Sequence, residues 1–128
     1  SKRVFINRKT GKPIVTDSCA KGKDWRASVQ AFARQAYDGP LLEGPLEVTM
    51  NFLILRPRHH YRGGKNAHLL RDNAPEHACK KPDVLKLARA VEDALTGVIW
   101  LDDAQIVQES LEKNYVGKPG VIVEVTTL

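Results

Sequence analysis

The sequence has little of the features that mark secreted and membrane proteins. Only Cys19 and Cys79 of its 128 residues are cysteines, too few for a disulfide framework, which predicts a reducing cytoplasm. No apolar run approaches the roughly 18 residues of a membrane span, and the first residues do not resemble a signal peptide. We therefore expect neither a disulfide-rich secreted protein nor a membrane protein. The length suits one domain, residues 1–128, and is too short for two ordinary ones.

What the chain does have is an uneven distribution of charge. Its net charge is +5 at pH 7, but residues 1–26 carry +6 and residues 56–81 carry +5, whereas residues 27–55 carry −2 and residues 82–128 carry −4. All four histidines also lie in the second basic stretch: His59, His60, His68 and His77. Basic segments of this kind commonly contact phosphate, so nucleic acid is an expected partner. An ordinary solvated surface is the alternative explanation.

Hydrophobic periodicity predicts a single α/β layer of the α+β type. Apolar runs and alternation predict strands at 4–6, 14–15 and 46–54, with a helix over about 22–38 between the second and the third. The later expected elements are a helix over 83–96 capped by Gly97, a short strand at 98–101, and strands at 105–115 and 120–127. Leaving aside the short strand at 98–101, the order β-β-α-β-α-β-β favours a mixed sheet with both helices on one face.

Residues 57–82 show no period and are rich in Gly, His and Lys. A loop of this length inside a compact domain is usually functional or disordered, so we expect a basic mobile loop. One alternative is a zinc site built from the histidines and cysteine of the loop: His59, His60, His68, His77 and Cys79. The His-x-Cys spacing at 77–79 is shorter than the usual spacing of zinc ligands, which disfavours this alternative.

Acidic residues stand at the ends of two neighbouring elements of the second half. Asp83 begins the predicted 83–96 helix, and Asp102 and Asp103 directly follow an apolar segment. Carboxylates that converge from a helix start and a strand end can bind Mg²⁺, which holds a scissile phosphate and activates water. Each acid taken alone is also an everyday feature of helix starts and turns. Leu85 is unusual, because it projects from the polar side of the helix near Arg89.

Three blocks of this chain resemble a known family. They are Lys81-Pro82-Asp83, Ala94-Leu95-Thr96-Gly97 and the run Trp100-Leu101-Asp102-Asp103-Ala104-Gln105-Ile106, preceded by Arg56-Pro57-Arg58-His59-His60. These motifs resemble the RusA-like Holliday junction resolvases of phages and prophages. The resemblance implies a homodimeric, Mg²⁺-dependent endodeoxyribonuclease of the bacterial cytoplasm that makes paired incisions in four-way DNA junctions, with Mn²⁺ as a substitute ion.

Site residues follow from that resemblance position by position. Asp83, Asp102 and Asp103 match acidic metal ligands of the family, and Arg89 stands where the family has a functionally important lysine. The second aspartate of the family's Asp-x-Asp motif falls on Leu85, so Asp93 is a further candidate ligand, with Glu92 a weaker one.

We expect backbone DNA contacts from Arg56, Arg58, His59, His60, Arg62, Lys65, Lys80, Lys81 and Lys86. Because leucine cannot bind Mg²⁺, the alternative function is a catalytically weak or inactive protein that binds branched DNA.

Overall fold

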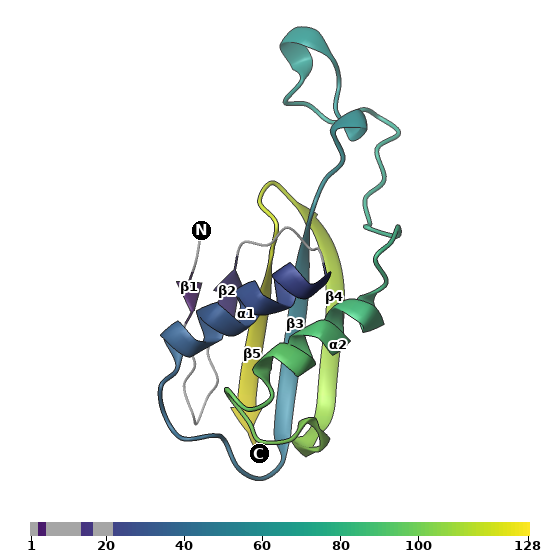
Figure 1. Ribbon diagram of the computed structural model, residues 1–128. Helices are drawn as coiled ribbons and strands as arrows, with labels where there is room; N and C mark the ends of the chain where they lie inside the picture. The colour runs from purple at the N-terminus through teal and green to yellow at the C-terminus, as the bar shows by residue number, and fades with distance from the viewer. Residues whose placement is uncertain (1–2, 5–13, 17–21) are drawn as a thin grey trace.

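The computed structural model describes residues 3–4, 14–16 and 22–128 (Figure 1). Its elements are β1 (Arg3–Val4), β2 (Ile14–Thr16), α1 (Gly22–Ala36), β3 (Leu46–Leu55), α2 (Val84–Leu95), β4 (Ile106–Val116) and β5 (Gly120–Thr127). Three short 3₁₀ turns complete the list: η1 (Arg58–His60), η2 (Gly64–Asn66) and η3 (Asp103–Gln105). No helix among the described residues has the length and apolar character needed to cross a bilayer.

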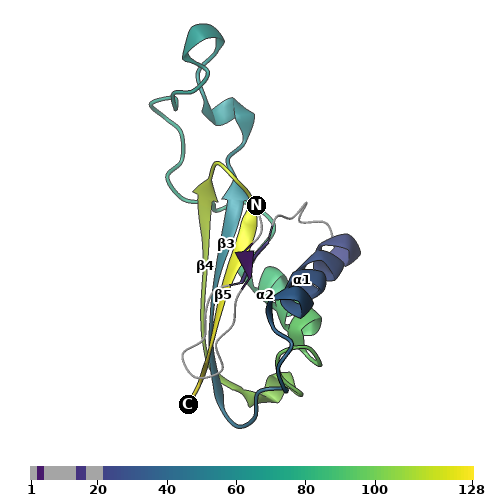
Figure 2. The same ribbon diagram turned by 90° about the vertical axis from the view of Figure 1, so that its left-hand side faces the viewer.

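The strands form one mixed sheet in the order β1-β2-β5-β3-β4. β3 lies parallel to β4 and antiparallel to β5, and the other described pairings are antiparallel. Both helices cover the same face of this sheet (Figure 2). The predicted order β-β-α-β-α-β-β and the predicted placement of the helices are therefore confirmed, with the exception of the short strand expected at 98–101. Of the first predicted strand, residues 5–6 lie outside the described part of the chain, and so does Cys19.

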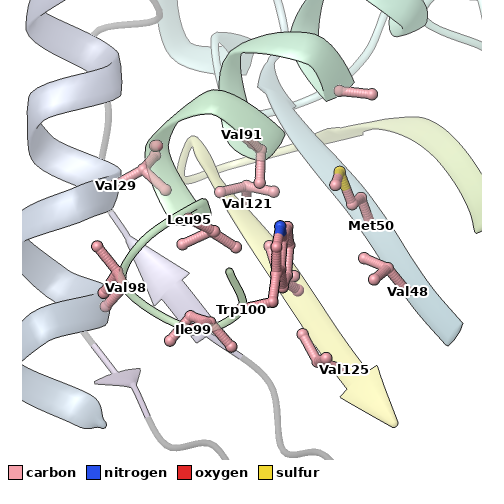
Figure 3. Packing of buried hydrophobic residues seen from close by; sticks show 14 of the residues in the cluster. Val29, Val48, Met50, Val91, Leu95, Val98, Ile99, Trp100, Val121 and Val125 are labelled. Atoms are coloured by element: carbon pink, nitrogen blue, oxygen red, sulfur yellow. The ribbon is translucent and has the colours of Figure 1, made fainter. Parts of the chain in front are cut away.

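The hydrophobic core lies between the sheet and the two helices (Figure 3). Alternate residues of β3 point into it, and the side chains of Val48 and Met50 are fully buried. The stripe of α2 that faces the sheet includes Val91 and Leu95, which are also fully buried. This packing fixes which side of α2 faces outward, and so it determines which polar residues of that helix are available for a site.

The predicted strand at residues 98–101 is wrong. Gly97 adopts a φ of 85°, and its N–H donates to the carbonyl oxygen of Trp100 at 2.6 Å, which closes a tight turn. Val98, Ile99 and Trp100 are buried as this turn enters the core, and Trp100 makes isolated bridges to Leu42 and Thr96. A run of four apolar residues is compatible with a buried turn as well as with a strand, so periodicity does not distinguish the two structures.

Residues 57–82, which we name the basic arm, extend past the end of the sheet (Figures 1 and 2). The arm contains η1 and η2, and Tyr61 forms an antiparallel bridge with Leu70. The N–H of Arg71 also donates to the carbonyl of His60 at 2.9 Å. The segment expected to lack regular structure therefore folds back on itself as a short hairpin-like loop, whereas its mobility remains a prediction.

Candidate active site

A cleft of about 550 Å³ lies between the outward face of α2 and the adjacent part of β4. Seven residues line it: Leu85, Lys86, Ala88, Arg89, Glu92, Asp103 and Glu109. Leu85, Arg89 and Glu92 come to the cleft together because residues three and four positions apart share one side of a helix. The cleft thus combines carboxylates with two cationic side chains, a composition suited to a phosphate and a divalent ion.

Glu109 is a carboxylate of this cleft that the sequence did not reveal. It lies opposite Val48 of β3, on the helix-facing side of β4, and Glu92 lines the same cleft. Burial raises the pKa of Glu109 to about 7, with further contributions from hydrogen bonding to the Glu92 side chain and from the charge of Glu92. Its Oε2 atom is buried and has no hydrogen-bond partner among the described residues.

The two adjacent aspartates take different roles in the turn before β4. The Asp102 carboxylate accepts a hydrogen bond from the N–H of Ala104 at 2.9 Å and caps η3, next to a separate hollow near Leu42. Asp103 instead lines the cleft on α2. Of these two adjacent aspartates, Asp102 therefore caps the 3₁₀ turn, whereas Asp103 lies at the cleft. As a metal ligand, Asp102 remains a prediction.

Gln105 holds this turn in place. Its side-chain oxygen accepts from the N–H groups of Leu101 and Asp102, each at 3.0 Å. Its side-chain nitrogen donates to the carbonyls of Leu42 at 2.9 Å and Gly44 at 3.0 Å. Sequence reasoning missed this role, although Asp102-x-x-Gln105 is the spacing of a capping box and could have indicated it.

The other two predicted ligands lie at opposite ends of the exposed side of α2. Asp83 is the N-cap of the helix, its carboxylate makes no capping hydrogen bond, and it lies 3.9 Å from Nζ of Lys86. Asp93 faces α1, where its carboxylate lies 3.7 Å from the guanidinium of Arg26. Within residues 3–4, 14–16 and 22–128, no three His, Cys, Asp or Glu side chains lie close enough to hold a metal ion.

The expected DNA-contact residues fall into two environments. Seven are exposed: Arg58, His59, Arg62, Lys65, Lys80, Lys81 and Lys86. Arg56 and His60 instead pack at the root of the basic arm. The Arg56 guanidinium lies 4.4 Å above the ring of Tyr115, and the His60 ring meets the same tyrosine edge-on at 5.4 Å.

His60 is 7% exposed, so it does not present its ring to a ligand as we expected. Burial lowers the pKa of His60, as do the neighbouring charges of His59, Arg56 and Lys80. The zinc alternative is not supported, because the five loop residues considered for it form no group of three in the described chain. Cys79 is an exposed free thiol.

Comparison with known proteins identifies the family of the chain that forms this cleft. The family model described as "Endodeoxyribonuclease RusA" matches residues 1–126. The chain belongs to the RusA endodeoxyribonuclease family. It is also 30% identical over 107 residues to the "Uncharacterized protein YqaN" of Bacillus subtilis (strain 168), a match covering 81% of this chain and 72% of that protein. The predicted resemblance is thereby confirmed.

Membership in the RusA family bears directly on the interpretation of this cleft. RusA enzymes are endodeoxyribonucleases that resolve Holliday junctions, so the chain belongs to a family of nucleases. Three positions that the resemblance singled out, 85, 89 and 103, line the same cleft although they come from two elements. At the first of them this member of the RusA family carries a leucine that is 69% exposed.

Proposed function

We propose that this chain is a Mg²⁺-dependent endodeoxyribonuclease that cuts four-way and related branched DNA in recombination, repair or phage DNA processing. The observation that carries the proposal is the joint placement of Arg89 and Asp103 in one cleft of a RusA family member. A homodimer would present two such clefts to two opposed strands of a junction, which accounts for paired incisions.

The residues around the cleft have the donor chemistry that Mg²⁺ requires. In proteins this ion is usually held by one or two carboxylates, with waters and substrate phosphates completing its shell. Asp103 supplies one carboxylate in the cleft. Asp83, at the N-cap of α2 and not among the residues that line the cleft, would supply a second carboxylate, since it is not used in capping. The buried, unpartnered Oε2 of Glu109 is a further oxygen acceptor there. When bound, the ion activates a water and stabilises the leaving oxygen.

The cationic residues would hold the DNA strand against these carboxylates. Arg89 faces the cleft, where its guanidinium can donate two parallel hydrogen bonds to a phosphate. Lys86 lines the same cleft and is exposed. The exposed cations of the basic arm would bind the backbone of an adjoining DNA arm, with affinity that falls as the salt concentration rises.

Asp103→Asn tests the proposal directly. The variant should lose at least about 100-fold in junction cleavage because it removes a carboxylate ligand, and it should still bind the junction because binding depends on the basic residues. A labelled four-way junction is followed by cleavage in Mg²⁺ and by gel shift without the ion. Asp38→Asn, which changes an exposed aspartate after α1, is the control and should cut normally. Undiminished cutting by Asp103→Asn would remove Asp103 from the site.

Leu85 favours a second candidate function. An apolar side chain at the mouth of the cleft contributes no ligand, so the protein would bind branched DNA while cutting it weakly or not at all. The two functions differ in one experiment on the wild-type protein. A junction that is shifted in the gel but stays intact in both Mg²⁺ and Mn²⁺ identifies the binding protein.

A further inference from the structure

Lys113 of β4 holds the end of the basic arm. Its side chain lies on the helix-facing side of the strand, opposite Phe52 of β3. The ammonium donates hydrogen bonds to two main-chain carbonyl oxygens, that of Lys80 at 2.8 Å and that of Pro82 at 3.0 Å. These carbonyls flank Lys81 and belong to the last residues of the arm before Asp83, so one side chain fixes the approach of the chain to α2.

The segment held by Lys113 would otherwise have little to orient it. Lys80, Lys81 and Asp83 are all exposed, so apolar packing does not determine their positions. Asp83 has an extended backbone, with a φ of −76° and a ψ of 152°, and its carboxylate makes no capping hydrogen bond. Apart from the contact with Nζ of Lys86 at 3.9 Å, the direction of that carboxylate depends on the path of the main chain from residue 80 to residue 83.

We propose that Lys113 is a positioning residue that orients Asp83, acting through the carbonyls of Lys80 and Pro82. This inference rests on the proposed function, in which Asp83 is a ligand of the ion. A lysine suits the role because its compact ammonium has three donors and can serve two carbonyls at once. A methionine of similar length has no donor and leaves both carbonyls without this partner.

The same side of β4 also holds the outgoing end of the arm. Tyr115, two residues beyond Lys113, packs against Arg56 and His60, and Arg56 donates to the carbonyl of Pro75 at 2.5 Å. Both ends of the arm are thus attached to one strand. In the proposed function, DNA bound by the arm would therefore be held near Asp83, which would link binding of the substrate to the ion site.

The test compares Lys113→Met with Lys113→Arg, which keeps charge and donors. In Lys113→Met we expect the single-turnover cleavage rate to fall about 10- to 100-fold, as for other residues that orient ligands, while junction affinity changes less than about threefold. The affinity for Mn²⁺, measured without DNA by electron paramagnetic resonance, should fall as well. Lys113→Arg should recover most of both properties. Lys113→Gln, with one donor group, should give intermediate values and serves if the methionine variant does not fold.

A direct readout keeps this test separate from the test of nuclease activity. In Lys113→Met the ¹³C carbonyl resonances of Lys80 and Pro82 should shift, whereas those of Leu69 and Leu70 near the arm tip should not. Lys118→Met, at the exposed turn between β4 and β5, should match the wild type in every measurement. If the wild type itself does not cut, the proposed function fails, and the resonances and Mn²⁺ affinity still decide the role of Lys113. Wild-type Mn²⁺ affinity in folded Lys113→Met would overturn the inference, whether or not the two carbonyl resonances shift.

Discussion

Replacing Glu109 with glutamine should make the stability of the protein less dependent on pH. Burial and the neighbouring Glu92 raise the pKa of Glu109 to about 7, from an ordinary value of 4.5. At pH values between these two pKa values, Glu109 holds a proton in the folded state that it has released in the unfolded state. The free energy of unfolding of the wild type therefore falls as the pH rises from 4.5 to 7. Above pH 7 this loss of stability is complete.

The size of the effect follows from the shift. A change of about 2.5 pKa units corresponds to an upper limit of about 3 kcal/mol. Partial solvent exposure at the cleft screens the interaction, so we expect on the order of 1–2 kcal/mol. The glutamine side chain is uncharged at every pH and resembles the protonated glutamate. Glu109→Gln should thus be more stable than the wild type by this amount at pH 8 and nearly equal to it at pH 4.5.

Urea unfolding between pH 4.5 and 8.5, followed by the fluorescence of the buried Trp25 and Trp100, measures this difference. EDTA is present so that no ion occupies the cleft. Glu112→Gln is the matched control, because Glu112 is exposed and aligned with Asn51 on the other side of β4. A stability difference between Glu109→Gln and the wild type that is the same at every pH would refute the reasoning, and so would a less stable variant at pH 8.

Two further predictions concern the cleft and the arm. Leu85→Asp adds a carboxylate to the cleft that Asp103 also lines, and it should tighten Mn²⁺ binding about tenfold in calorimetric titration and speed junction cleavage. Unchanged Mn²⁺ affinity would show that position 85 does not reach the ion. Arg58→Ala combined with Lys65→Ala should reduce the slope of log affinity against log salt by about 2 for junction binding, because two exposed cations are lost, and an unchanged slope would exclude these residues from phosphate contact.

Local patterns were sufficient to predict most of the fold. The apolar stripe of α2 identified both the helix and its outward side, because that stripe can be buried in one orientation only. The run at residues 98–101 was misassigned, because its burial depends on a turn at Gly97 that brings it into the core. The existence of the helices and the long strands thus followed from periodicity, whereas the conformation of the short apolar segment depended on tertiary packing.

The candidate site was predicted in part, for a different reason. Arg89 and Asp103 were found through their fixed spacing in a known motif, and the structure places both in one cleft. Glu109 was missed because its proximity to Glu92 depends on the register of β4 with β3 and on the side of the sheet that α2 covers. Asp102 and Asp103 are equivalent in sequence, and the cap on η3 is what separates them.

The basic arm is inserted in the connection between two strands that are already neighbours, β3 and β4. Those strands pair along their full length without any contribution from the arm tip. Residues between the two attachment points could therefore be lengthened, shortened or exchanged while the sheet keeps its alignment. If the arm binds DNA as proposed, grafting a different tip onto the same root would change the DNA shape that is bound while the cleft stays as it is.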